Sequence, residues 1–501
     1  MDAKRLYGTV AACAVVVYLG ALWNGFAVDD LPIIVLNPLI ANVSGVWRAF
    51  AAPYWSADLG GHMYRPLVIA GFALDRLVGA GPAWFHAVNL LWHAAASVAV
   101  AALARRWADA TVALIAGLLF AVHPVHVEAV ANIVGRAELM AALFTVLAVY
   151  AGLTRESVGW SAAALGLGLL SKENAAVAPA LVAWGWLLGL SRPGRRRMAL
   201  FLTSWALVGG AYAAVRAAVR HPFAGYESIA PMFVGEAPLT VRLTALHSLA
   251  DVTRLLVFPL KLRVDYSPAE RTVVTSPLDP RFLAGLACVL VWGALLVSAW
   301  RRGRKMEAFG LGWIGVAFLP VANLLFPAGF YLAERTLYLP SVGFVLAAAA
   351  GLARLPQQRL RPLVAGLVLL AGLRTAVRVP VWRTNESVTR SVIHDSPRSY
   401  VGPKRLTALF LDRHEPARAA EWARIAAGLY DRDPTIYVTG AVAEFAAGDP
   451  RGADSLLAQL ERLCHGGCSG YYRHEAAVAR ARGYPEAADS LLARVGRLRP
   501  P

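Results

Sequence analysis

Two adjacent carboxylates, Asp29 and Asp30, directly follow a long apolar stretch that ends at Phe26. Adjacent carboxylates repel each other, so one of them can keep a raised pKa and act as a general base, or the pair can hold a cation. Two solvated acids at the end of a helix would give the same pattern. The segment continues with a series of aromatic and polar residues, Trp47, Tyr54, Trp55, Tyr64 and Arg65. Such aromatic side chains are typical of an interfacial helix.

A second polar segment carries His123, His126, Glu128, Arg136 and Glu138. Two histidines and a glutamate within six residues could ligate a divalent metal. Pro124 breaks the turn between the histidines, however, and the spacing is not that of two metal ligands on one helical face. The pattern favours a hydrogen-bonding cluster around a phosphate or a sugar, with Arg136 as the anion ligand.

Three further segments place charged and aromatic residues between apolar stretches. They contain Lys172 and Glu173, then Arg263, Asp265 and Tyr266, and then Glu334, Arg335 and Tyr338. An anionic lipid headgroup would explain Lys172, and an ion pair of Lys172 with Glu173 or Glu138 is the alternative. One such segment is ordinary, but five that converge on one face would form a site.

The elements that must position these residues are membrane helices. Hydrophobic residues make up 57% of the 501 residues and charged residues only 16%, where a soluble domain has about 25%. Apolar blocks such as 6–26, 282–300 and 309–326 approach the roughly 20 residues that cross a bilayer. Backbone polar groups in lipid must be satisfied within the segment, so the blocks are helices. We expect an all-α fold with about eleven transmembrane helices, the first of them a retained helix rather than a removed signal.

The net charge of +17 reflects basic clusters between the apolar blocks, which argues against a nucleic-acid partner. The clusters lie at 4–5, 105–106, 155, 192–197, 301–305 and 354–361. Short basic loops face the cytoplasm, so the polar segments described above must face the other side. This assignment requires the stretch 241–259, which contains four titratable residues, to be an interfacial or re-entrant helix rather than a span.

The chain changes character near residue 390, which predicts a membrane domain at 1–390 and a helical domain at 391–501. The second part is rich in Ala, Arg, Glu and Asp, and Gly and Pro break it into about six amphipathic helices. The rhythm suggests three tetratricopeptide-like repeats, although any small helical bundle would look similar. Cys464 and Cys468 fit a disulfide in an oxidising compartment better than a metal site, since only His465 is nearby to help.

Seven ordered motifs carry a resemblance to a known family. They are 28–30 (VDD), 64–67 (YRPL), 85–93 (FHAVNLLWH), the block 123–138, 170–173 (LSKE), 264–268 (VDYSP) and 333–341 (AERTLYLPS). This set resembles the transmembrane and tetratricopeptide-repeat (TMTC-type) O-mannosyltransferases, which belong to the GT-C glycosyltransferases.

The resemblance implies an inverting enzyme that takes a sugar, expected to be mannose, from a polyprenyl-phosphate donor. Asp29 would be the base on an acceptor hydroxyl and Asp30 its partner. Arg136, Lys172 and Arg335 would neutralise the phosphate. The remaining pocket residues would be His123, His126, Glu128, Glu138, Glu334, Tyr64, Arg65, Asp265 and Tyr266. No cofactor is certain from the sequence, and a divalent metal stays possible.

The tail has room for about three repeats, fewer than many family members carry, so the acceptor could be protein Ser or Thr or a lipid or glycan. Composition suggests a bacterial source, with the chain in the inner membrane and the site on the periplasmic face. A transporter would place ionisable residues mid-span, which this sequence mostly does not do. A non-catalytic scaffold anchored in the bilayer would not need a polar rim.

Overall fold

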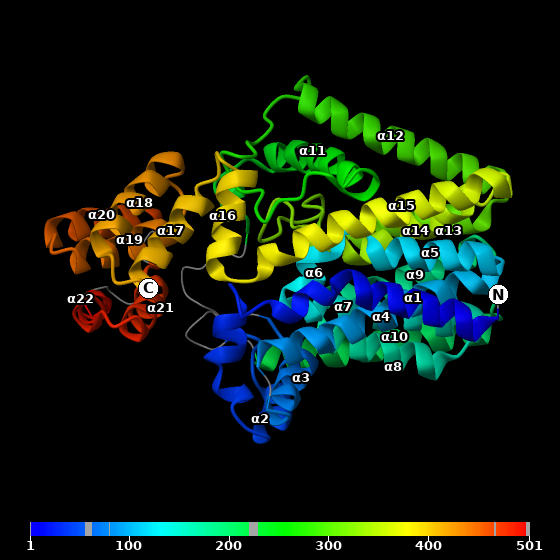
Figure 1. Ribbon diagram of the computed structural model, residues 1–501, viewed down its shortest axis with the longest axis horizontal. Coiled ribbons are helices and arrows are strands. Elements are labelled where there is room, and N and C mark those ends of the chain that lie inside the picture. The colour runs from blue at the N-terminus through cyan, green and yellow to red at the C-terminus, as the bar shows by residue number, and fades with distance from the viewer. Residues whose placement is uncertain (1, 56–62, 80, 220–228, 465–466, 497–501) are drawn as a thin grey trace.

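The computed structural model describes residues 2–55, 63–79, 81–219, 229–464 and 467–496 (Figure 1). Every regular element within these ranges is helical, which confirms the all-α prediction. The first helices are α1 (Ala3–Tyr18), α2 (Ser44–Arg48), α3 (Pro66–Leu77), α4 (Pro82–Trp107), α5 (Ala110–Val122) and α6 (Val127–Ala131). They are followed by α7 (Arg136–Thr154), α8 (Val158–Ser171), α9 (Ala178–Leu187), α10 (Arg195–Val219) and α11 (Pro238–Val257). The bundle ends with α12 (Pro280–Arg301), α13 (Lys305–Phe318), α14 (Tyr338–Leu352) and α15 (Gln357–Arg378).

Burial separates a central set of helices from a peripheral set. The apolar segment that contains α7 is 78% buried and the one that contains α14 is 61% buried. By contrast, the corresponding segments of α10 and α12 are only 11% buried, although they are as apolar as the central ones. A soluble protein would not leave such helices uncovered, so these two present their apolar side chains to lipid.

Seven helices in the described ranges are long and apolar enough to cross a membrane, or eight if the bent pair of α5 and α6 forms one span. The other predicted spans correspond to α8, α9 and α13, which have 14, 10 and 14 residues and are shorter than the roughly 20 that a span needs. The chain is therefore a multi-pass membrane protein, and the count of eleven stays a prediction. Helix α11 falls outside the candidate spans, and its interfacial or re-entrant placement also stays a prediction.

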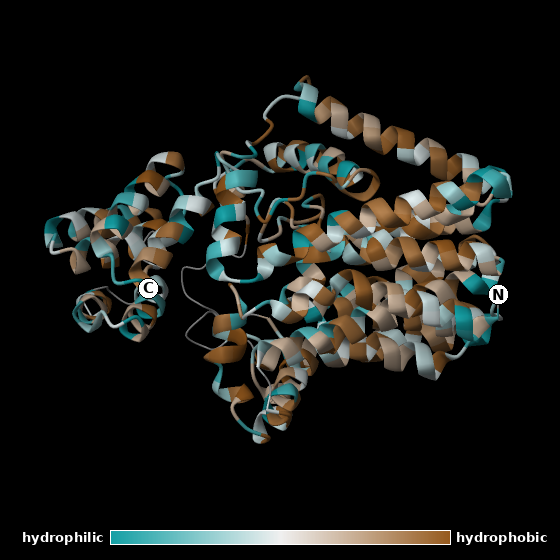
Figure 2. Ribbon diagram, viewed as in Figure 1, coloured by the Kyte–Doolittle hydropathy of each residue, from teal (hydrophilic) through white to brown (hydrophobic). Residues whose placement is uncertain are grey.

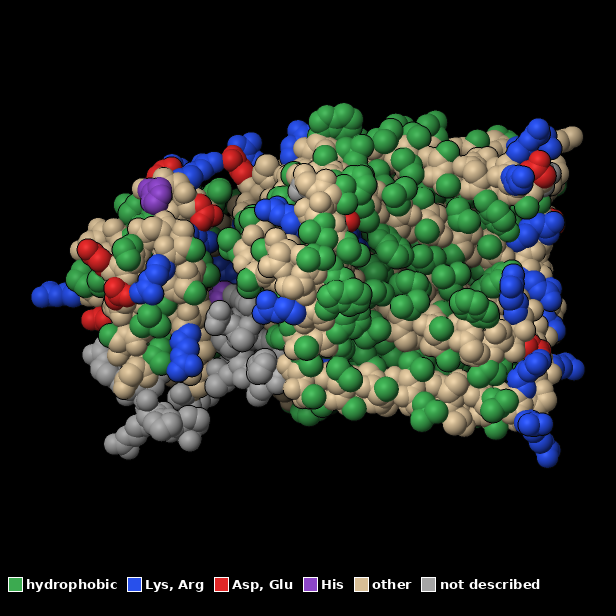
Figure 3. Space-filling view, turned by 90° about the horizontal axis from the view of Figure 1, so that it is seen from below, with side chains coloured by type: hydrophobic (Ala, Val, Ile, Leu, Met, Phe, Trp, Pro, Cys, Tyr) green, Lys and Arg blue, Asp and Glu red, His purple; other side chains and the backbone are tan. Residues whose placement is uncertain are grey.

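The two ends of the bundle differ in chemistry. Lys and Arg side chains gather at the end where the N-terminus lies, next to a belt of hydrophobic side chains (Figure 3). The same belt appears as predominantly hydrophobic helices in Figure 2. The C-terminal helices lie beyond the opposite end of the bundle (Figure 1). The basic clusters thus share one end, as the positive-inside pattern requires of one membrane face.

Six helices follow α16 (Asn385–Asp395) and match the six predicted from Gly and Pro breaks to within about two residues. They are α17 (Val401–Asp412), α18 (Pro416–Leu429), α19 (Pro434–Ala446), α20 (Pro450–Cys464), α21 (Ser469–Ala481) and α22 (Pro485–Val495). Four of them begin with Pro, which has the φ angle of a first helical residue and needs no N–H partner there. Gly448 and Gly483, at φ +86° and +84°, end the preceding helices.

Helices α17 to α20 pack each against the next, α21 packs on α19 and α22, and the set has its own hydrophobic core. Helix α16 crosses the predicted boundary at residue 390 and packs on α17. The division into two domains and the tetratricopeptide character of the second remain predictions.

Candidate active site

A cavity of about 1530 Å³ lies between the bundle and the C-terminal helices. Its charged lining residues are Asp29, Arg65, Glu138, Lys172, Glu173, Arg216, Arg335, Lys404, Arg432, Asp433 and Arg462. Tyr54, Trp55, Phe326, Phe330 and Tyr400 supply aromatic surface. Several predicted site residues from distant parts of the chain therefore meet in one space.

Asp29 lines the cavity, whereas its neighbour Asp30 is fully buried. The Asp30 carboxylate accepts hydrogen bonds from the backbone N–H of Ala27 at 3.1 Å and of Val134 at 3.0 Å. Val28, directly before Asp29, has φ +54°, a strained conformation for a β-branched residue. Asp30 therefore ties the loop to the start of the α7 segment, and this tie leaves Asp29 open to the cavity.

Burial raises the pKa of Asp30 to about 7, with the charge of Asp29 acting in the same direction and the three backbone amides around it opposing. The carboxyl with this raised pKa is the one that holds the loop together. The sequence could not separate the two roles, because that separation depends on which side chain the fold buries.

Lys172 and Glu138 form a buried ion pair on the cavity wall, and the amide of Asn174 donates to the second oxygen of Glu138 at 3.0 Å. Burial lowers the pKa of the Lys172 ammonium, and the cationic Arg65 and Arg335 lower it further against the opposing charge of Glu138. Lys172 therefore lies close to two further cations, and each of the three has its own carboxylate partner.

Arg65 and Arg335 are the two other cations near Lys172. The Arg65 guanidinium donates to Glu173 from two nitrogens, at 3.0 and 3.2 Å, and lies over the Tyr54 ring. Arg335 pairs with the buried Glu128, which also accepts from the Arg335 backbone N–H at 2.9 Å. The Arg335 side chain is 35% exposed, whereas its partner Glu128 is 3% exposed. Three cations on one wall can receive an anion near Asp29.

Arg136 lies elsewhere, although its position in the sequence suggested a phosphate ligand. Its side chain is 1% exposed, pairs with Asp75, and donates to Asn89 at 2.8 Å and to the Phe85 carbonyl at 3.0 Å. It also lies over the Phe72 ring. These contacts of the Arg136 guanidinium join α3, α4 and α7, and the side chain does not line the cavity.

The two histidines also lie outside the cavity lining. A ring nitrogen of His123 is 3.0 Å from the Leu256 carbonyl, and one of His126 is 2.7 Å from the Ser341 hydroxyl. No group of three or more His, Cys, Asp and Glu side chains that could hold a metal occurs among the residues with described positions. These imidazoles join the bent α5–α6 pair to α11 and α14.

Four more predicted pocket residues lie behind the wall. Glu334 accepts from the Arg263 backbone N–H at 2.5 Å and from the Tyr266 hydroxyl at 2.8 Å. Asp265 accepts from the Ser399 hydroxyl at 2.7 Å, which links the bundle to the C-terminal part. The Tyr64 hydroxyl donates to the Phe50 carbonyl at 2.8 Å. None of these four lines the cavity, and each fixes a loop that does.

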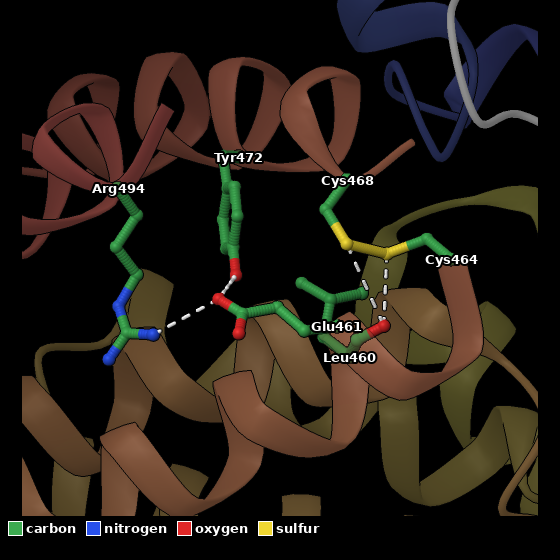
Figure 4. Close-up of a disulfide and its surroundings, with 6 residues drawn as sticks. All are labelled: Leu460, Glu461, Cys464, Cys468, Tyr472 and Arg494. Carbon is green, nitrogen blue, oxygen red and sulfur yellow. Dashed lines mark hydrogen bonds and ion pairs between the residues drawn. A yellow bond between two sulfur atoms is a disulfide. The ribbon is translucent and has the colours of Figure 1, made fainter. Parts of the chain in front are cut away.

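The C-terminal helices close the cavity on its far side with Tyr400, Lys404, Asp433 and Cys464. Lys404 pairs with Asp433 at 2.9 Å, and the hydroxyl of Tyr430 donates to the Pro231 carbonyl of the bundle at 2.7 Å. Cys464 and Cys468 form a disulfide, as predicted, at the turn between α20 and α21 (Figure 4). His465, the other candidate ligand, lies outside the described residues.

Known proteins share this sequence pattern. Residues 73–220 match the family described as dolichyl-phosphate-mannose-protein mannosyltransferase. Protein O-mannosyl-transferase TMTC3 of Mus musculus is 30% identical over 394 residues, which cover 70% of this chain and 42% of that protein. Protein O-mannosyl-transferase F38B6.6 of Caenorhabditis elegans is 29% identical over 404 residues, 77% of this chain and 57% of its own length. Over most of its length the chain is similar to the TMTC-type O-mannosyltransferases.

Protein O-mannosyl-transferase TMTC4 of Homo sapiens is 28% identical over 464 residues, 79% of this chain and 62% of that protein. The chain thus spans about half the length of the curated TMTC-type relatives that it matches. Among solved structures, an Archaeoglobus fulgidus oligosaccharyltransferase covers 97% of this chain and 52% of its own, with 13% identity and a TM-score of 0.23. That TM-score is too low to support a conclusion about the fold.

Sequence reasoning missed several residues of the site. Arg216 lines the cavity from the end of α10, and a charged residue inside an apolar stretch is by itself a signal of function. Glu173 was considered only as a partner of Lys172, whereas it binds Arg65. Nothing in the sequence pointed to Asp75, which pairs with Arg136, or to Lys404, because both depend on tertiary packing.

Proposed function

We propose that the chain transfers a sugar, mannose in the first instance, from a polyprenyl-phosphate donor to a hydroxyl acceptor. One observation carries the proposal. The cavity brings the open carboxylate of Asp29 together with the cations Arg65, Lys172 and Arg335. A base beside several cationic side chains suits a reaction in which a hydroxyl loses a proton while a phosphate leaves.

In the proposed step, the acceptor oxygen attacks the anomeric carbon of the sugar from the side opposite the phosphate. The hydroxyl proton moves to the Asp29 carboxylate, a new carbon–oxygen bond forms, and the bond between the anomeric carbon and the phosphate oxygen breaks. The bonding electrons stay on that oxygen, so the leaving group is the polyprenyl monophosphate. The configuration at the anomeric carbon is inverted.

Lys172 and Arg335 are proposed to bind the leaving phosphate, with Arg65 adding charge behind them. Each of the two is held by a buried carboxylate, Lys172 by Glu138 and Arg335 by Glu128. Little side-chain conformational entropy is therefore lost when the phosphate binds. Arg136 is assigned a positioning role, because its partners already satisfy it and its side chain does not line the cavity, although its neighbours Gly135 and Ala137 do.

The acceptor is proposed to be protein Ser or Thr that enters between the bundle and the C-terminal helices. The likeness to proteins named protein O-mannosyl-transferases supports this choice. We further propose an eleven-span membrane domain at 1–390 and a repeat-like domain at 391–501. In this arrangement the cavity faces the periplasm of a bacterial inner membrane, and undecaprenyl phosphate carries the sugar.

A transfer assay tests the proposal. The purified full chain, reconstituted in lipid nanodiscs, is given radiolabelled polyprenyl-phosphate mannose and a set of Ser- and Thr-containing peptides, with GDP-mannose as the control donor. We expect transfer from the lipid donor only. Lys172→Ala should raise the donor KM by about tenfold to a hundredfold, in line with the loss of one charge-assisted contact of about 1.5–3 kcal/mol.

Arg106→Ala is the matched control, since it removes an exposed cation in the last turn of α4 that does not line the cavity. Mass spectrometry of the product separates a peptide acceptor from a lipid or glycan acceptor. Failure to transfer mannose or any other sugar from polyprenyl-phosphate donors would refute the enzymatic proposal and favour a membrane-anchored scaffold.

A further inference from the structure

A second, smaller cavity of about 230 Å³ lies between α8 and α10. Its lining is mostly apolar: Leu165, Leu169, Glu173, Ala176, Pro179, Trp205, Gly209, Tyr212 and Arg216. Three of these residues, Glu173, Ala176 and Arg216, also line the large cavity. The two spaces are therefore neighbours that share one wall.

The smaller cavity lies on the lipid side of the bundle. Among the residues of α10, only Phe201 and Trp205 are buried, and its main packing partner is α8. Figure 3 shows a broad hydrophobic surface on the face where α3, α8 and α10 lie. At Gly209, an added Cβ atom would meet no other atom within 4 Å. The gap between α8 and α10 is thus an apolar groove that borders the bilayer.

Two side chains fix the walls of this groove. The Trp205 indole N–H donates to the Ser161 hydroxyl of α8 at 3.2 Å, and the Tyr212 hydroxyl donates to the Tyr64 carbonyl at 3.2 Å. The first contact holds α10 against α8, and the second holds it against the loop that carries Arg65. The groove is therefore a built feature of the fold.

Arg216 is the only cation among the residues that line both cavities. Its Nε atom is buried and has no hydrogen-bond partner. The adjacent Glu173 already accepts two hydrogen bonds from Arg65. Burial acts to raise the pKa of Glu173, but Arg65, Lys172 and Arg216 lower it below its usual value, so Glu173 is ionised and Arg216 lies within its field. A buried donor without a partner at this place is suited to an anion.

A polyprenyl-phosphate sugar has three parts in a fixed order: a polar sugar, a charged phosphate and an apolar chain. If the sugar occupies the large cavity and the chain stays in lipid, the phosphate must lie where a polar space meets an apolar one. In the described part of the chain, the wall shared by the two cavities has this character, and Arg216 lies on it.

Resting on the function proposed above, we propose that the α8–α10 groove takes the first isoprene units of the donor and that Arg216 holds its phosphate at the junction. Arg216 thereby orients the donor so that the anomeric carbon faces Asp29 and the phosphate can reach Lys172. The ligand class is a lipid-linked phosphodiester, and the groove recognises its chain.

Blocking the groove while sparing the polar cavity tests this proposal. Gly209→Leu fills the groove, and Gly210→Leu is the matched control. Gly210 is the next residue of α10, an added Cβ there also meets open space, and it lines neither cavity. Leu169→Trp narrows the groove from α8 and serves if Gly209→Leu does not fold. The donors are undecaprenyl-phosphate mannose and the methyl phosphodiester of mannose 1-phosphate, which has no chain, assayed as a substrate or as a competitive inhibitor.

We expect Gly209→Leu to raise the KM of the undecaprenyl donor by about tenfold or more, because the isoprenoid chain loses its apolar contacts. The KM or inhibition constant of the methyl ester, which has no such chain, should stay unchanged. Gly210→Leu should match wild type. Arg216→Met should weaken both donors, and Arg216→Lys should recover part of the loss. Equal behaviour of the two glycine variants would place the chain elsewhere, and an unchanged KM in Arg216→Met would remove Arg216 from phosphate binding. Absence of transfer by wild type with any donor would instead overturn the proposed function.

Discussion

Replacement of Arg136 distinguishes a structural cation from a phosphate ligand. The Arg136 side chain is 1% exposed and its partner Asp75 is 11% exposed, so the pair is buried. Arg136→Met leaves the Asp75 carboxylate without its cation and also removes the hydrogen bonds to Asn89 and to the Phe85 carbonyl. Breaking a buried ion pair from one side costs about 3–5 kcal/mol. We expect Arg136→Met to lower the free energy of unfolding by that amount.

The double variant Arg136→Met with Asp75→Leu removes both charges, and apolar replacements of a buried pair are often neutral. It should therefore recover most of the lost stability, while Asp75→Leu alone should cost about as much as Arg136→Met. The free energy is measured by denaturant unfolding of the purified full chain in detergent micelles. Donor KM is measured in parallel on the folded fraction and should equal that of wild type.

A different pair of results would refute this reasoning. If Arg136→Met unfolds at the wild-type denaturant concentration but binds the donor much more weakly, Arg136 is the phosphate ligand that its sequence position suggested. The cavity described above would then be incomplete.

Two further predictions concern the anchoring carboxyl and the disulfide. The pKa of Asp30 in the folded chain, raised by burial to about 7, exceeds the value of about 3.9 in an unfolded chain, so its contribution to stability is fully present below about pH 4 and is lost as the pH rises through about 7. The melting temperature of Asp30→Asn should therefore fall less over this pH range than that of wild type. Identical pH profiles would contradict the burial of this carboxyl. Joint replacement of Cys464 and Cys468 by Ser should destabilise the C-terminal helices by about 2 kcal/mol, the loop-entropy value for so short a closed loop. Non-reducing peptide mapping of the wild type checks that the disulfide exists. Two free thiols would contradict the prediction.

The helices of the chain could be predicted from the sequence because their signals are local. Pro416, Pro434, Pro450 and Pro485 mark helix starts, and apolar blocks mark the bundle. Length alone does not give the span count, since α8, α9 and α13 are shorter than the roughly 20 residues of a full span. Local pattern therefore predicts which elements exist, but not how each relates to the bilayer.

The composition of the site could be predicted only in part, because polar residues on one face of a membrane protein either line a cavity or brace its wall. Lys172 and Arg335 line it, whereas Arg136 and His126 are hydrogen-bonded behind it. The difference depends on partners that are distant in sequence, such as Asp75 for Arg136. The roles of Asp29 and Asp30 divide for the same reason, since only tertiary packing buries one of two adjacent carboxyls.

The most direct test of the site compares Asp29→Asn with Asp30→Asn in the mannose-transfer assay, with binding of the lipid donor measured separately. Loss of a general base lowers turnover by about 10²–10⁴-fold. Asp29→Asn should lower kcat by this factor and still bind the donor, while Asp30→Asn should keep measurable turnover in its folded fraction. Wild-type turnover by Asp29→Asn would contradict the account, as would loss of turnover confined to Asp30→Asn.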